Sequence, residues 1–73
     1  MNVEAQLRKT MRTDAGMRRL LDVIFGVGKY AYDPTEDVWV CPNKDHKGPG
    51  RGFIVVKRGG DWFTAVLPDE VLA

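Results

Sequence analysis

The residues best suited to chemistry in this sequence of 73 residues lie in one stretch rich in glycine and proline, residues 42–52. The stretch carries His46, the only histidine, together with Lys44, Lys47 and Arg51. A neutral imidazole can act as a general base, and neighbouring cations can stabilise the charge of a phosphate. The glycines of the stretch lack the spacing and the following helix of a phosphate-binding motif. We therefore interpret residues 42–52 either as a catalytic loop or as a solvated connection between strands.

Other side chains that could ligate a metal or move a proton fit structural roles better. Cys41 ends an apolar run beside Pro42, a setting typical of a buried thiol. A single cysteine excludes an internal disulfide and most zinc sites with four protein ligands. Asp33, Glu36 and Asp37 flank a proline, where acidic side chains usually cap turns. We expect no metal and no cofactor.

Charge favours no single class of partner. The formal net charge is +1, whereas a protein dedicated to coating DNA or RNA is usually strongly basic. Arg8, Arg12 and Arg19 fall within about 40° of one another on a helical wheel, so they form either a stripe for phosphates or an acidic protein, or a solvated helix face. No stretch approaches the roughly 18–20 apolar residues of a membrane span, and no secretory signal is present. With its lone cysteine, the chain is expected to be cytoplasmic, without a membrane partner.

The first third of the chain has the apolar periodicity of a helix over residues 3–25. Thr13, Asp14 and Gly16 interrupt the pattern. Either one long helix covers the segment, or Thr13 or Asp14 caps a second helix after a short first one. Gly26 provides the stop. The apolar positions that define the pattern are Val3, Leu7, Met11, Met17, Leu20, Leu21 and Ile24.

The remaining residues predict strands. Residues 30–41 form a first strand broken at Asp33-Pro34, and residues 53–57 and 62–67 form two more, while residues 69–72 could begin a helical turn. The Gly59-Gly60 pair predicts a two-residue hairpin loop. We expect a single α+β domain over residues 1–73, with an N-terminal helix, or two short helices, packed on a three-stranded, mostly antiparallel sheet over residues 30–67.

The predicted hairpin is apolar on both faces. A two-residue loop places Lys57 opposite Trp62 and Val56 opposite Phe63. A sheet with one solvated face would show polar side chains there, and exposed apolar patches usually mark an interaction surface. The alternative is that another part of the chain covers the second face. One face would hold Ile54, Val56, Phe63, Ala65 and Leu67, and the other Phe53, Val55, Trp62, Thr64 and Val66.

Two resemblances concern ribonucleases. The order helix, strand, loop with His46, strand, tight turn and strand ending in Val-Leu-Pro resembles the small HicA-type toxins that cleave messenger RNA, although their Gly-Ser-His signature is absent. The closing segment over residues 55–68 is similar to the final hairpin of barnase/RelE-like, metal-independent ribonucleases. The second resemblance implies catalytic help from Thr64, Lys57 and Arg51.

The leading hypothesis is a small non-enzymatic interaction module, acting as an accessory, inhibitor or regulator. It would dock an apolar sheet face and a basic helix onto a protein or nucleoprotein partner, and a homodimer is a further possibility. The first alternative is a toxin-type ribonuclease using His46 and Arg51 with Lys57 and Thr64, and the second is a nucleic-acid-binding protein without catalysis. The predicted docking residues are Phe53, Val55, Trp62, Val66, Arg8, Arg12 and Arg19.

Overall fold

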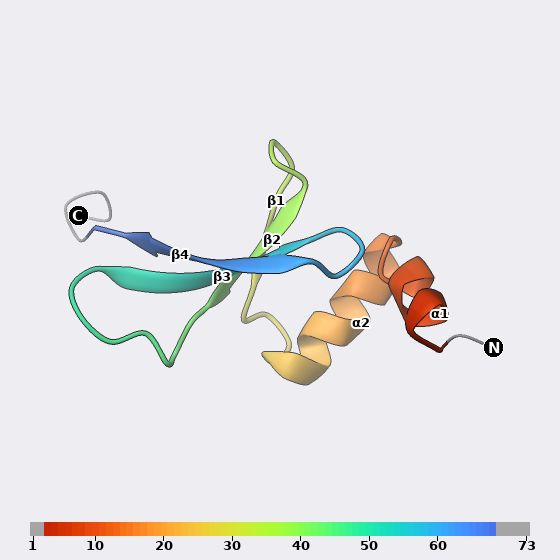
Figure 1. Ribbon diagram of the computed structural model, residues 1–73, viewed down its shortest axis with the longest axis horizontal. Coiled ribbons are helices and arrows are strands. Elements are labelled where there is room, and N and C mark those ends of the chain that lie inside the picture. The colour runs from red at the N-terminus through yellow and green to blue at the C-terminus, as the bar shows by residue number, and fades with distance from the viewer. Residues whose placement is uncertain (1–2, 69–73) are drawn as a thin grey trace.

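The computed structural model describes residues 3–68, and the helical turn expected at residues 69–72 lies outside this range. The strands form one antiparallel sheet in the order β1-β2-β3-β4. The α+β class is confirmed, but the sheet has four strands instead of the three predicted. The elements are α1 (Val3–Thr10), α2 (Asp14–Ile24), β1 (Ala31–Asp33), β2 (Val38–Pro42), β3 (Arg51–Lys57) and β4 (Trp62–Leu67) (Figure 1).

The helical segment is divided at Thr13, so the alternative with two helices is the correct one. Thr13 has an extended backbone, and its hydroxyl accepts a hydrogen bond from the Gly16 amide at 3.0 Å. This N-cap satisfies an amide that the first turn of α2 leaves unpaired. Gly16 also allows the two helices to meet closely, since a Cβ atom at this position would lie 2.0 Å from the Thr10 carbonyl oxygen.

The fourth strand arises from the segment predicted as one interrupted strand. Residues 34–37 form a turn, and the chain returns on itself as the β1–β2 hairpin, with Asp33 opposite Val38. The Asp33 carboxylate accepts a hydrogen bond from the Thr35 amide at 2.9 Å, as in an Asx turn. Asp37 completes the turn with a φ of 54°. The proline therefore lies in a reversal of the chain, where its missing amide costs no ladder hydrogen bond.

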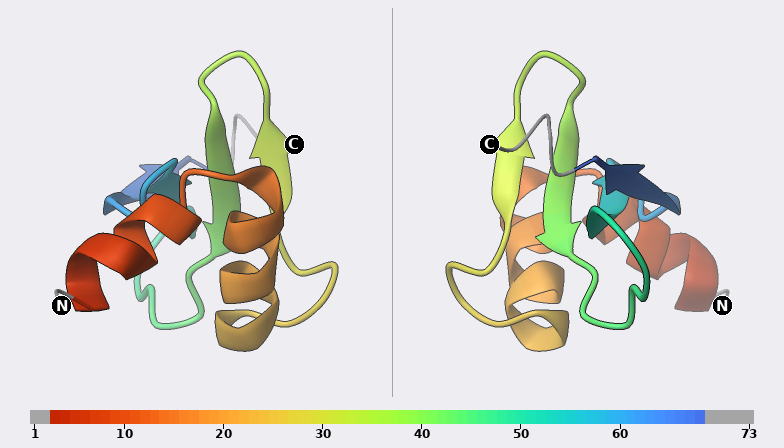
Figure 2. Two further views of the ribbon diagram at one scale, coloured as in Figure 1. Left: turned by 90° about the vertical axis from the view of Figure 1, so that its right-hand side faces the viewer. Right: turned by 90° about the vertical axis from the view of Figure 1, so that its left-hand side faces the viewer.

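The core lies where α2 packs on the middle of the sheet, as Figure 2 shows for α2 and β2. Met17 and Leu21 of α2 meet Trp39 and Cys41 of β2 and Val56 of β3, and all five side chains are buried. Burying side chains of this size stabilises a fold by about 1.5–3 kcal/mol each. Their contacts hold α2 in place on the sheet.

The pairing predicted for the β3–β4 hairpin was wrong by one residue. Val56 lies opposite Trp62 and Val55 opposite Phe63, so the loop has three residues, 58–60. The Lys57 amide donates to the Asp61 carbonyl oxygen at 2.6 Å, and both glycines of the loop have positive φ angles. The Gly59 amide donates to the Met11 carbonyl oxygen at 3.1 Å, which ties the loop to the end of α1. Because side chains alternate along a strand, this shift moves every β4 side chain to the other face.

The sheet therefore has two different faces. The helix-side face carries Trp39 and Cys41 of the core, and the open face is the opposite one. Both helices lie near the turn of the β3–β4 hairpin, and the other end of this hairpin extends away from them (Figure 1). The open face carries Val38, Val40, Phe53, Val55, Lys57, Phe63, Ala65 and Leu67, and the helix-side face carries Trp39, Cys41, Ile54, Val56, Trp62, Thr64 and Val66.

Candidate functional site

The open face is an apolar surface that neither described helix covers. Val38, Val40 and Val55 line the floor of a shallow concavity of about 720 Å³, and Phe63 of β4 stands beside them. Phe63 is 46% exposed, whereas Val38 is buried between neighbouring strands. Apolar side chains on an uncovered, concave sheet face can bind the apolar side chains of another molecule.

Charged side chains surround this floor. Asp33, Glu36 and Asp37 line the concavity at the β1–β2 turn, and Lys57 lies on its β3 side. The Lys57 ammonium is 5.7 Å from the centre of the Phe63 ring, within the range of a cation–π interaction. Arg58 also lines the concavity, so the open face combines an apolar floor with a rim of three carboxylates and two cations.

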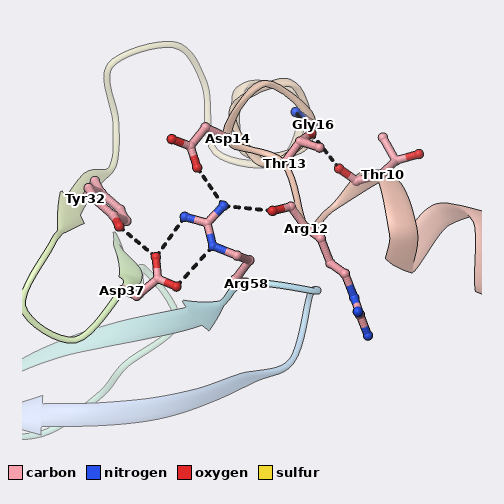
Figure 3. Close-up of polar contacts among 8 residues, drawn as sticks. All are labelled: Thr10, Arg12, Thr13, Asp14, Gly16, Tyr32, Asp37 and Arg58. Carbon is pink, nitrogen blue, oxygen red and sulfur yellow. Dashed lines mark hydrogen bonds and ion pairs between the residues drawn. The ribbon is translucent and has the colours of Figure 1, made fainter.

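Arg58 holds the acidic turn in position (Figure 3). Its Nε and Nη2 atoms donate to the two carboxylate oxygens of Asp37 at 3.0 and 2.8 Å, and Nη1 donates to Asp14 at 2.6 Å. Nη1 also donates to the Arg12 carbonyl oxygen at 2.8 Å, and the guanidinium carbon Cζ lies 5.0 Å from the centre of the Trp39 ring. A guanidinium with these partners is a structural clamp between the β3–β4 loop, the β1–β2 turn and the start of α2.

The same contacts change the acidity of Asp37. Hydrogen bonds from Arg58 and from the Tyr32 hydroxyl, at 2.6 Å, stabilise the charged carboxylate and lower the pKa of Asp37 to about 2. The hydrogen bond to Asp37 raises the pKa of Tyr32. The hydrogen bonds that Arg58 donates to Asp37 and Asp14 raise the pKa of Arg58. Asp37 is therefore a charged structural group, which leaves Asp33 and Glu36 as the rim carboxylates.

The predicted apolar docking residues do not share one face. Phe53 and Val55 lie on the open face, whereas Trp62 and Val66 lie on the helix-side face. Trp62 and Val66 are nevertheless 65% and 52% exposed, since Trp62 only borders a groove beside α2 and the far end of β4 extends away from the helices (Figure 1). The sheet does have an uncovered apolar surface, but the β4 residues that belong to it differ from those predicted, because the register of the hairpin differs.

The three predicted arginines do not form one stripe, since the helix is interrupted between them. Arg8 lies in α1 and forms an ion pair with Asp61 at 3.1 Å. Arg12 lies in the connection between the helices, and Arg19 is exposed on α2. The predicted stripe assumed one continuous helix axis, whereas the chain turns at Thr13 between two separate helices.

His46 lies in the connection from β2 to β3. Its Nε2 atom is 3.2 Å from the carbonyl oxygen of Pro49, and because a carbonyl can only accept, Nε2 is the protonated nitrogen in this contact. The ring packs directly on Gly52, where a Cβ atom would lie 2.3 Å from the Cβ of His46. These contacts fold the connection back against the start of β3.

The four residues of the ribonuclease alternative are not brought together. Arg51 and Lys57 lie on the open face at the two ends of β3, which separates them by roughly 20 Å at 3.3 Å per residue. Thr64 and the His46 ring, which packs on Gly52, lie on the helix-side face. The set as predicted cannot act on one phosphate in this arrangement.

No metal site is evident among residues 3–68, where no three His, Cys, Asp or Glu side chains gather. Cys41 is fully buried in the core, and burial raises the pKa of its thiol to about 11, so it is a poor nucleophile at neutral pH. None of the described helices is long and apolar enough to cross a membrane.

Sequence reasoning missed the contribution of β2 to the open face. Val38 and Val40 alternate with Trp39 and Cys41, a run that is apolar at every position and so did not reveal which side chains face the helices. Comparisons of the chain with protein-family models, with curated proteins and with solved structures found no match.

Proposed function

We propose that this chain is a non-enzymatic interaction module, an accessory, inhibitor or regulator that binds a protein partner through the open face. The observation that supports the proposal is the uncovered apolar floor over β2, β3 and β4, with Phe63 46% exposed beside it. Leaving such side chains in water forfeits roughly 25 cal/mol for each Å² of apolar surface, which a docked partner would recover. The proposal needs shape and apolar contact, and it needs no reactive group.

The charges around the floor indicate the chemistry of the partner. Asp33 and Glu36 place negative charge beside Val38 and Val40, so a nucleic acid phosphate near the β1–β2 turn would meet repulsion. A protein segment with apolar side chains flanked by lysine or arginine fits the same surface, because its cations would face the carboxylates. We therefore propose a protein partner of this kind instead of a nucleic acid.

The test compares partner capture by the wild-type chain with capture by two open-face variants. Phe63→Glu places a charge beside the floor, and Val40→Glu places one on β2, well away from the β4 edge. Proteins captured from a host lysate are identified, purified and titrated against each variant by calorimetry. We expect both variants to weaken binding by about tenfold or more, as for truncation of a central apolar contact.

Val23→Glu is the matched control, since Val23 is apolar and 81% exposed but lies on α2, away from the open face. It should bind the captured protein as the wild-type chain does, and circular dichroism should show that all three variants are folded. The proposal is overturned if the open-face variants bind like the wild type, or if Val23→Glu alone abolishes binding.

The metal-independent ribonuclease stays a prediction without a favouring observation, because His46, Arg51, Lys57 and Thr64 are divided between the two faces. Incubating the chain with RNA beside a His46→Ala variant tests it directly. RNA that stays intact rejects the prediction, and cleavage that survives in the variant rejects the role given to His46.

A further inference from the structure

Among residues 3–68, β4 is an edge strand, and its own sequence lacks the usual protections against pairing. Its six residues, Trp62–Leu67, include no charge, no proline and no glycine. Natural edge strands are normally short, charged, bulged or covered, because their free amide and carbonyl groups can pair with another strand. The edge at β1 has only three residues, Ala31–Asp33, and ends in a charged side chain. The two edges of this sheet therefore differ, and β4 is the one suited to pairing.

The hydrogen-bond pattern identifies which β4 groups point outward. Lys57 donates to Asp61 across the hairpin, and on the other side of β3 Asn43 donates to Gly52. In an antiparallel sheet hydrogen-bonded and non-hydrogen-bonded pairs alternate. Both of these hydrogen bonds imply that Trp62, Thr64 and Val66 form the non-hydrogen-bonded pairs with β3. Their amide and carbonyl groups thus point away from β3, toward the free edge.

The side chains of these same residues stand on the helix-side face, where the helices leave them exposed. Trp62 and Val66 are 65% and 52% exposed, and Thr64 is exposed between them. Trp62 borders an apolar groove of about 200 Å³ that is also lined by Leu20 and Ile24 of α2. A strand added at this edge would satisfy the free backbone groups and cover these apolar side chains together.

We propose that the occupant of this edge is the β4 strand of a second copy of the chain, paired antiparallel about a two-fold axis at Thr64. Thr64 then lies opposite Thr64 of the second copy, and Trp62 lies opposite Val66 of the second copy in both halves of the interface. Threonine pairs and pairs of an aromatic with a β-branched side chain are favourable across strands. The strand is thus complementary to itself in one register, as a two-fold interface requires.

The flanking residues limit the pairing to this register. In it Pro68 lies opposite Gly60 of the second copy, and a proline has no amide to donate, so the ladder ends there. The paired strands bring no like charges together, and the net charge of +1 on each chain adds little repulsion. The two sheets would become one, with both open faces on the same side. The pairing uses the β4 edge and not the open face, so this inference does not depend on the proposed function.

The test measures mass in solution for the wild-type chain and for Thr64→Lys, Thr64→Glu and Thr64→Val. Sedimentation equilibrium from about 1 µM to about 1 mM should show a dimer of the wild type. Thr64→Lys and Thr64→Glu each place two like charges on the two-fold axis, so each should raise the dimer dissociation constant by about tenfold or more. Thr64→Val keeps the branched shape without a charge and should dimerise like the wild type.

Mixing the Thr64→Lys and Thr64→Glu chains gives the decisive result. In the proposed register opposite charges meet at the axis, so the mixture should form a heterodimer at concentrations where each variant alone is monomeric. A wild-type chain that stays monomeric up to about 1 mM overturns the inference. A dimer that tolerates Thr64→Lys, or a mixture that shows no recovery, also overturns it, as does a strand of another protein bound at this edge of a monomer. None of these results bears on partner binding by Val40→Glu.

Discussion

The two ends of the β3–β4 hairpin belong to different environments. At the end with the turn, Val56 packs under Met17 and Leu21 of α2, and Arg58 joins three separate elements. The other end, which carries Phe53, Ala65 and Val66, extends away from both described helices (Figure 1). The molecule measures 47 × 24 × 19 Å, an elongated shape for a chain of this length. The packing that stabilises the fold is concentrated in the half with the turn, which leaves the apolar side chains of the other half without a described helix above them (Figure 1).

The largest effect is expected in the helix-covered half. Leu21 is 1% exposed, so Leu21→Ala should lower the free energy of unfolding by about 2–5 kcal/mol through lost burial and a residual cavity. A domain this small has little stability to lose, and the variant should be largely unfolded at 37 °C. Urea denaturation followed by tryptophan fluorescence measures the change. A loss below about 1 kcal/mol would contradict the position of the core.

Gly16→Ala should also destabilise the fold, against the usual trend for helices. Alanine in place of glycine normally stabilises a helix by about 1 kcal/mol. Here the new Cβ atom would lie 2.0 Å from the Thr10 carbonyl oxygen, and the close approach of α1 to α2 would have to open. We expect a net loss of about 1–3 kcal/mol in urea denaturation, typical of overpacking. A more stable variant would show that the two helices do not meet as described.

The clamp at Asp37 should make stability dependent on acid. The pKa of Asp37 is lowered to about 2, below the value of about 3.9 for an unfolded chain. Its ionised carboxylate therefore stabilises the fold fully above about pH 4, and this contribution is lost as the pH falls toward 2. Asp37→Asn removes the charge, and asparagine tolerates the φ of 54° at this position.

Urea midpoints measured between about pH 5 and about pH 2 check this prediction. The midpoint of the wild-type chain should fall more steeply with acid than the midpoint of Asp37→Asn. Parallel curves for the two chains would mean that Asp37 is not held by Arg58 in solution.

The smallest effect on folding is expected at Trp62, which stays exposed although it lies opposite Val56 near the turn. Its side chain is 65% exposed, so Trp62→Ala should change the free energy of unfolding of the monomer by less than about 1 kcal/mol. The measurement uses low protein concentration, where association does not contribute. Loss of the fold would make Trp62 part of the core and would contradict its exposed position.

The turn residues show why the sequence predicted the elements better than their register. Gly59-Gly60 correctly indicated a hairpin between residues 57 and 62, but two-residue and three-residue loops both accept glycine. The three-residue loop is observed together with hydrogen bonds that only the folded chain can form. They run from Gly59 to Met11 and from Arg58 to Asp37 and Asp14. The candidate site changed accordingly, since it depends on which β4 side chains face the helices.

Local chemistry along the chain determined the α+β class, Thr13 and Asp14 as candidate caps, the glycines of the hairpin turn and the excess of apolar side chains over what two short helices can cover. These features depend on neighbours in sequence, so a pattern of a few residues suffices to predict them. Only the tertiary structure decided that the helix breaks at Thr13, that residues 30–41 form a hairpin and that Phe63, not Trp62, belongs to the open face. A shift of one residue exchanges the two faces of a strand at little local cost, so neighbours in sequence do not fix the register. The observed register occurs together with contacts between distant residues, such as those of Arg58 with Asp14 and Asp37.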